Sequence, residues 1–140
     1  MDDIHHATSV SIDGKGLLIK GASGSGKTSL AFELLALGAT LIADDRTCLR
    51  LEQGEVVASV PTTIAGQIEA RGVGILNAPE AGPTKITIVV DLDSVEQDRI
   101  PPRRTITLLG CELPLLYRSD GIPLASVLWH YMHFGRHDDP

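Results

Sequence analysis

The chain has 140 residues, a length that predicts one domain, residues 1–140, around a single core. Its 12 Lys and Arg against 18 Asp and Glu give a formal net charge of -6, so long-range repulsion argues against nucleic acid as a partner. The N-terminus lacks a basic and apolar leader, and no apolar run is long enough to cross a bilayer. Cys48 and Cys111 stand apart without zinc-ligand spacing. These features predict a soluble cytoplasmic protein that binds neither nucleic acid nor membrane.

The first third of the chain has the pattern of two strands, a glycine-rich loop and a helix. "ATSVSI" and "KGLLIKG" are strand-like and flank Asp13-Gly14, which predicts a hairpin with a type I′ turn. Apolar residues at helical spacing predict a helix over 27–37, and Gly38 stands where a helix C-cap is expected. The next segment, "TLIADD", is expected to be a strand.

The middle of the chain predicts a second hairpin followed by an irregular stretch. "CLRLE" and "VVASV" flank Gln53-Gly54 and are expected to pair. The segment "PTTIAGQIEARGVGILN" mixes helix-start and loop signals, so no regular element is predicted there.

The last third begins with "KITIVVDL", an uninterrupted apolar run typical of a strand buried on both faces. Pro101 and Pro102 predict a loop over "EQDRIPPRR". A short strand, "TITLLG", and a closing helix over 121–134 follow. The whole pattern predicts an α/β fold with a mixed sheet and flanking helices.

The segment "GASGSGKT" satisfies the phosphate-loop pattern G-x-x-x-x-G-K-[ST] between a predicted strand and a predicted helix, the context that such a loop requires. Its glycines let successive backbone N–H groups point inward and form an anion-binding nest with the helix N-terminus. Lysine would reach the terminal phosphates of ATP, and the threonine hydroxyl would bind Mg²⁺. The predicted nucleotide-binding residues are Gly21, Ala22, Ser23, Gly24, Ser25, Gly26, Lys27 and Thr28. The alternative is a glycine-rich turn that binds nothing.

A phosphate loop needs an acid at the end of a neighbouring strand, and the chain offers two candidates. Asp44-Asp45 ends the strand after the loop helix, and Asp91 ends the buried strand. We favour the pair, because one carboxylate can approach the metal while the other accepts a proton from a substrate hydroxyl. The alternative is a solvated Asp-Asp turn.

The segment "HATSVSIDGKGLLIKGASGSGKTSLAFELLALGATLIADD" resembles the catalytic domain of the HPr kinase/phosphorylase family, bacterial enzymes that phosphorylate a serine of the phosphocarrier protein HPr. "IEARGVGILN" is similar to the family's signature of a glutamate followed by Arg-Gly-x-Gly, and "DRIPPRR" is close to its Asp-Arg pair before the last strands. The resemblance extends from His6 to about Leu109. It implies a P-loop core similar to that of HPr kinases and phosphoenolpyruvate carboxykinases, with ATP and Mg²⁺ as cofactors.

The resemblance also implies roles for single residues. His6, expected on the strand before the turn, matches the family's active-site histidine. Asp45 is expected to accept the serine proton, with Asp44 the second choice for that role. Arg99 matches a catalytic arginine, and Glu69 a magnesium contact beside Thr28. Each has a structural alternative: His6 could be half-buried and inert, Glu69 could simply face solvent, and Arg99 could belong to a solvated basic loop.

The chain departs from the family at both ends. It resembles a short form without the family's additional N-terminal domain, and in "LLYRSDGIPLAS" only Arg118 matches the arginine-rich loop associated with dephosphorylation. Kinase activity on HPr is therefore better supported than phosphorolysis. The family implies a homo-oligomer, an assembly that the shorter ends bring into question. Two other functions stay open at the level of sequence: a P-loop kinase of a small molecule, and an ATP-sensing regulatory domain without catalysis.

Overall fold

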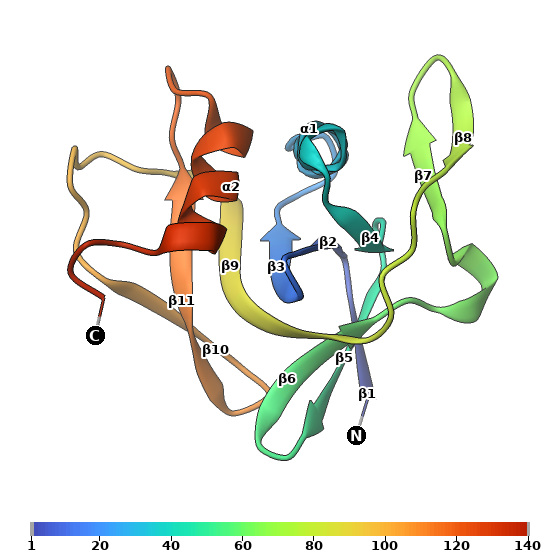
Figure 1. The fold of residues 1–140 in the computed structure, drawn as a ribbon, viewed down its shortest axis with the longest axis horizontal. Helices are drawn as coiled ribbons and strands as arrows, with labels where there is room; N and C mark the ends of the chain where they lie inside the picture. Colours follow the sequence, from blue (N-terminus) through green and yellow to red (C-terminus); the bar gives the residue numbers. More distant parts are fainter. Residues whose placement is uncertain (1, 140) are drawn as a thin grey trace.

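The computed structural model describes residues 2–139, and within that range it forms a curled nine-stranded sheet with two α-helices on one of its faces, and a separate two-stranded sheet (Figure 1). The helices are α1 (Lys27–Leu37) and α2 (Leu124–Phe134), and a short 3-10 helix covers Thr62–Ile64. Neither α-helix has the length and apolar character that crossing a membrane requires. The strands are β1 (Asp2–His5), β2 (Ala7–Ile12), β3 (Lys15–Lys20), β4 (Thr40–Ala43), β5 (Thr47–Glu52), β6 (Glu55–Ser59), β7 (Gln67–Ala70), β8 (Gly74–Asn77), β9 (Thr84–Val95), β10 (Arg104–Leu108) and β11 (Cys111–Arg118).

The long strand β9 is the centre of the sheet. It pairs in parallel with β3 and with β11, while β2 runs antiparallel between β3 and β4. Because β3, β9 and β11 are parallel, their carboxyl ends lie at one edge of the sheet. The loop between β3 and α1 leaves the sheet at this edge, the position at which open α/β sheets bind ligands.

Both faces of the central strands are buried, as the uninterrupted apolar run predicts. On β3, Leu17 and Ile19 pack beneath the helices, whereas Leu18 belongs to a second cluster on the opposite face. The residues of β9 divide in the same way, with a register shift near Thr87. Each large apolar side chain buried in this way contributes about 1.5–3 kcal/mol to stability. The α/β class and mixed sheet are confirmed.

Local turn chemistry explains the first elements. Asp13 and Gly14 both have positive φ, 53° and 75°, as a type I′ turn requires. Helix α1 has the predicted bounds and ends at Gly38, whose φ of 119° and N–H bond to Leu35 satisfy the C-terminus.

Four details differ from the sequence prediction. The segment 67–77, for which no regular element was predicted, is the β7–β8 hairpin, which forms a separate two-stranded sheet. Residues 111–118 form β11, and the N-terminal residues form β1, so His6 lies between β1 and β2 rather than on a strand. Strand β4 ends at Ala43, so the acidic pair lies in the turn that follows it.

Candidate active site

The glycine-rich loop connects β3 to α1 and is held in a tight turn. Gly24 and Gly26 have φ of 82° and 102°, values that a residue with a Cβ rarely adopts. Within the described chain no side chain caps α1, and its first turn holds no acid. The N–H groups of this turn and the positive end of the helix dipole are therefore available to an anion.

Lys27 is the first residue of α1 and is buried, with 6% of its surface exposed. Its ammonium donates to the carbonyls of Gly21 (2.7 Å) and Ala22 (3.2 Å) at the start of the loop. A buried ammonium requires such acceptors, and its third proton remains for a further one. The positive charge of Lys27 therefore lies inside the loop rather than in solvent.

The packing of the loop also explains its first glycine. A Cβ on Gly21 would meet the Ser25 hydroxyl oxygen and the Leu92 Cβ at 3.3 Å, so no larger residue fits without displacement. The Ser25 hydroxyl is buried and has no hydrogen-bond partner among residues 2–139. Buried polar groups are normally paired, so this unsatisfied group inside the loop is consistent with a site built for a polar ligand.

Asp44 connects the loop helix to two other elements. It is 8% exposed, and its Oδ1 accepts hydrogen bonds from the hydroxyls of Thr28 (2.9 Å) and Thr8 (3.1 Å). Its Oδ2 accepts the backbone N–H of Glu69 on β7 at 3.1 Å. Hard oxygen donors of this kind are those that Mg²⁺ prefers, so the hydroxyl of Thr28 and the carboxylate of Asp44 fit the metal predicted from the sequence.

Asp45 differs from its neighbour in almost every respect. Its side chain is 59% exposed, and its Oδ1 lies 2.5 Å from Nε2 of His6, which is itself 53% exposed. Its φ is 68°, a left-handed conformation that aspartate tolerates better than most residues. The two acids therefore divide into one buried carboxylate fixed beside Thr28 and one accessible carboxylate paired with histidine.

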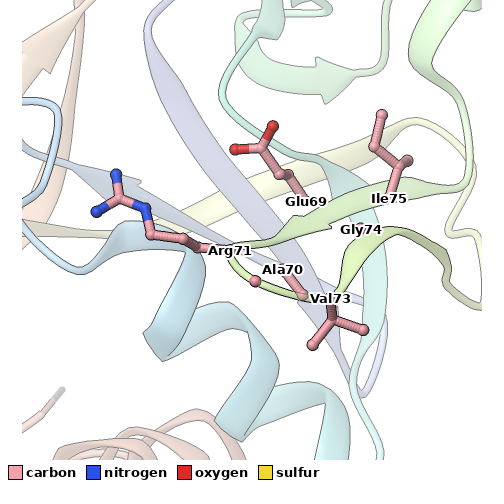
Figure 2. A pocket seen from close by; sticks show the side chains of 7 residues that line it. Glu69, Ala70, Arg71, Val73, Gly74 and Ile75 are labelled. Atoms are coloured by element: carbon pink, nitrogen blue, oxygen red, sulfur yellow. The ribbon is translucent and has the colours of Figure 1, made fainter.

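The structure brings Glu69 beside this site through its backbone. Figure 2 shows the carboxylate of Glu69 on the same side of the β7–β8 hairpin as Ile75, its partner across the two strands. The side chain is exposed. In the part of the chain that the structure describes, no three Asp, Glu, His or Cys side chains form a metal-binding group. Binding of Mg²⁺ by Glu69 stays a prediction.

Arg99 lies in a different place. It belongs to the loop between β9 and β10, which Figure 1 places on the far side of α2 from the β7–β8 hairpin. Among residues 2–139, no hydrogen bond or ion pair joins it to His6, Lys27 or either acid. With Ile100, Leu116 and Tyr131 it lines a pocket of about 250 Å³. Its catalytic role stays a prediction.

Two residues contact the site without having been predicted from the sequence. Thr8 on β2 binds both acids, and Asp93 near the end of β9 accepts the N–H of Ala22 with both carboxylate oxygens at 3.0 Å. The sequence offers a weak signal for Asp93, an acid just beyond the buried run. It offers none for Thr8, a threonine at an ordinary inward position of a strand. The other candidate acid, Asp91, instead accepts the N–H of Asp93 at 2.9 Å.

Fold and site together define a P-loop protein: an α/β sheet with a glycine loop, a buried lysine and an acid beside the loop's threonine. The model of the HPr Serine kinase C-terminal domain matches residues 2–107, and the chain belongs to that family. It is similar to curated proteins named HPr kinase/phosphorylase, with 35% identity over 124 residues to one from an Exiguobacterium species and 40% over 102 residues to one from Listeria monocytogenes.

These matches cover 79% and 67% of this chain but 40% and 33% of the relatives, so the chain spans well under half of their length. Among solved structures it resembles the Hpr(Ser) kinase/phosphatase from Coxiella burnetii, with a TM-score of 0.79 and 23% identity, covering 94% of this chain and 88% of the other. At that identity the likeness concerns the fold, and it agrees with the P-loop core expected from the sequence.

Proposed function

We propose that this protein transfers the γ-phosphoryl group of ATP to a serine hydroxyl of HPr. The observation that carries the proposal is the arrangement of the two acids: Asp44 is tied to Thr28 of the phosphate loop, while Asp45 next to it is accessible and paired with His6. Membership of the HPr kinase family and relatives named HPr kinase/phosphorylase support the choice of substrate.

In this proposal the N–H groups of the loop and the ammonium of Lys27 bind the phosphates of ATP. The serine oxygen attacks the γ-phosphorus, the bond between that phosphorus and the bridging oxygen breaks, and ADP leaves. Asp45 accepts the proton that the serine loses, and His6 orients the Asp45 carboxylate. Positioning and electrostatics supply most of the rate acceleration, since the chemistry itself needs little from the protein.

Thr28 and Asp44 would hold Mg²⁺, and Glu69 would provide a further oxygen from the adjacent hairpin. The metal supplies charge neutralisation on the phosphates when it is bound. Arg99 is proposed to offset charge on the transferring group, which requires its loop to approach the phosphate loop when HPr binds. A homo-oligomeric state and a cytoplasmic location stay predictions.

The test is mass spectrometry of HPr after incubation with the full chain, ATP and Mg²⁺, with EDTA as the control. We expect phosphorylation of one serine in the presence of Mg²⁺ and none in the presence of EDTA. Inorganic phosphate added afterwards would remove the modification only if the chain also catalyses phosphorolysis. Unmodified HPr with labelled products in a metabolite panel would instead indicate a small-molecule kinase, and tight ATP binding without any transfer would indicate a regulatory domain.

A further inference from the structure

Thr8 on β2 has a single side-chain hydroxyl that contacts both acids of the site. The residue is 0% exposed. Its Oγ1 donates to Oδ1 of Asp44 and accepts the backbone N–H of Asp45, each at 3.1 Å. A hydroxyl has one proton and two acceptor positions, so these two bonds use the proton and fix its direction.

The hydrogen bond from Thr8 to Asp44 is one of three that this carboxylate accepts within residues 2–139. Thr8, Thr28 and the N–H of Glu69 all donate to it, and they come from β2, α1 and β7. Convergent donors fix the rotamer of a carboxylate and keep it an acceptor. Thr8 is the donor on the sheet side, so without it Asp44 would be held only from the helix and the hairpin.

The bond from Asp45 fixes the backbone at the point where the chain turns out of the sheet. Asp45 has a φ of 68°, and the next residue, Arg46, donates its N–H to the Asp44 carbonyl at 2.8 Å. A left-handed residue persists only where its surroundings hold it. The hydroxyl of Thr8 is the partner of the Asp45 N–H, so it helps to set the direction in which the Asp45 carboxylate leaves the turn towards His6.

We propose that Thr8 is a positioning residue for phosphoryl transfer, whose hydroxyl holds the metal-side acid Asp44 and the proton-accepting acid Asp45 at a fixed relative placement. The inference rests on the function proposed above and adds to it. Since Thr8 makes no hydrogen bond to the loop N–H groups or to Lys27 within residues 2–139, its loss should affect turnover more than ATP binding.

The neighbouring residue on the same strand provides a matched control. Ser9 is also 0% exposed, and its hydroxyl pairs with that of Thr47 at 3.0 Å. Thr47 also donates to the Ala7 carbonyl, so Ser9→Ala leaves it with a partner. Both positions therefore carry a buried, hydrogen-bonded hydroxyl on β2, but only Thr8 contacts the acids.

The experiment compares Thr8→Val, Thr8→Ser and Ser9→Ala in the full chain, with kcat and KM for ATP measured in HPr phosphorylation. A small misplacement of reacting groups can cost on the order of a hundredfold in rate, so we expect kcat of Thr8→Val to fall about 10- to 100-fold with KM for ATP changed less than about threefold. Thr8→Ser should restore most of kcat, and Ser9→Ala should keep it within about twofold of the wild type.

Amide hydrogen exchange at Asp45 provides a readout that does not depend on activity. Removing the partner of this N–H should speed its exchange in Thr8→Val by about tenfold or more, but not in Ser9→Ala. Equal loss of kcat in Thr8→Val and Ser9→Ala, or unchanged kcat and exchange in Thr8→Val, would overturn the positioning role. A wild type inactive on HPr would instead refute the proposed function. The exchange rate of the Asp45 N–H would then still show whether Thr8 fixes the backbone at the acid pair.

Discussion

Two regions on the helix-covered face of the sheet, the surroundings of Asp44 and the pocket lined by Arg99, differ in how tightly their polar residues are held. Around Asp44, side chains and N–H groups from β2, α1 and β7 converge on one buried carboxylate. Beside α2, Arg99 and Tyr131 instead line a pocket whose other residues are largely apolar. The hydrogen bonds nearby, such as the one from Arg104 to Glu96 at 2.9 Å, lie within the β9–β10 segment itself. A site for in-line transfer needs fixed geometry, so we expect the chemistry to occur beside Asp44.

The largest effect should come from the exposed acid. Asp45→Asn removes the proton acceptor but keeps a side chain that tolerates the left-handed backbone, so we expect kcat for HPr phosphorylation to fall about 10²- to 10⁴-fold without unfolding. Asp13→Asn is the matched control, since Asp13 also has positive φ and is exposed in the distant β2–β3 turn. A normal kcat in Asp45→Asn would show that another group accepts the serine proton.

Lys27→Ala should reduce transfer by roughly 10²- to 10³-fold, because the variant loses a positive charge at the terminal phosphates. Steady-state kinetics and circular dichroism together check that activity is lost while the fold is retained. The control is Lys85→Ala, which removes a lysine that pairs with Glu55 on the surface and is 51% exposed. Full activity in Lys27→Ala would contradict the proposed use of the loop.

Gly21→Ala tests the packing of the loop against β9. The added methyl group would collide with Ser25 and approach Leu92, and overpacking of this kind costs about 1–3 kcal/mol. We expect a lower urea midpoint and weaker ATP binding. Gly82→Ala should change neither, because a Cβ there meets no atom within 4 Å.

Arg99→Ala tests whether the loop between β9 and β10 contributes to phosphoryl transfer. No hydrogen bond or ion pair joins Arg99 to the acids or to Lys27 within residues 2–139, so its proposed role requires the loop to move, and we expect kcat to fall about tenfold, less than for Lys27→Ala. Arg103→Ala is the control for loss of a positive charge, since Arg103 pairs with Asp139. An unchanged kcat in Arg99→Ala would show that the loop does not reach the phosphate site during turnover.

The smallest effect concerns the stability of the protein at low pH, to which the ion pair between Glu96 and Arg104 contributes. The hydrogen bond from Arg104 holds the pKa of Glu96 below its ordinary value of 4.5. A lowered folded-state pKa means that this contribution to stability is present above pH 4.5 and is lost as the pH falls through the folded-state pKa. Thermal unfolding from pH 6 to pH 3 should therefore show a slightly shallower decline for Glu96→Gln than for the wild type. Identical curves would show that the pair contributes nothing measurable.

Local patterns predicted much of the fold. The Asp13-Gly14 turn, the helix from Lys27 to Leu37 and the buried run of β9 follow from backbone preferences and periodicity, which act over a few residues. The β7–β8 hairpin was not predicted for two reasons. The segment from Arg71 to Gly74 has no two-residue turn signal, and β7 and β8 expose most of their side chains, so they lack an apolar pattern. Strand β11 was missed because it holds Pro114 and because the turn that pairs it with β10, Leu109-Gly110, is not one of the usual hairpin dipeptides.

The sequence by itself determined the phosphate loop and the presence of an acid pair, since glycine torsions, a lysine and a helix start are all encoded within one short segment. Only the tertiary structure decided that Asp44 is buried beside Thr28 and Asp45 exposed beside His6, and that Thr8 contacts both. The physical reason is that burial and hydrogen-bond partners depend on which distant strands meet at the sheet edge. A pattern of neighbouring residues does not contain that information.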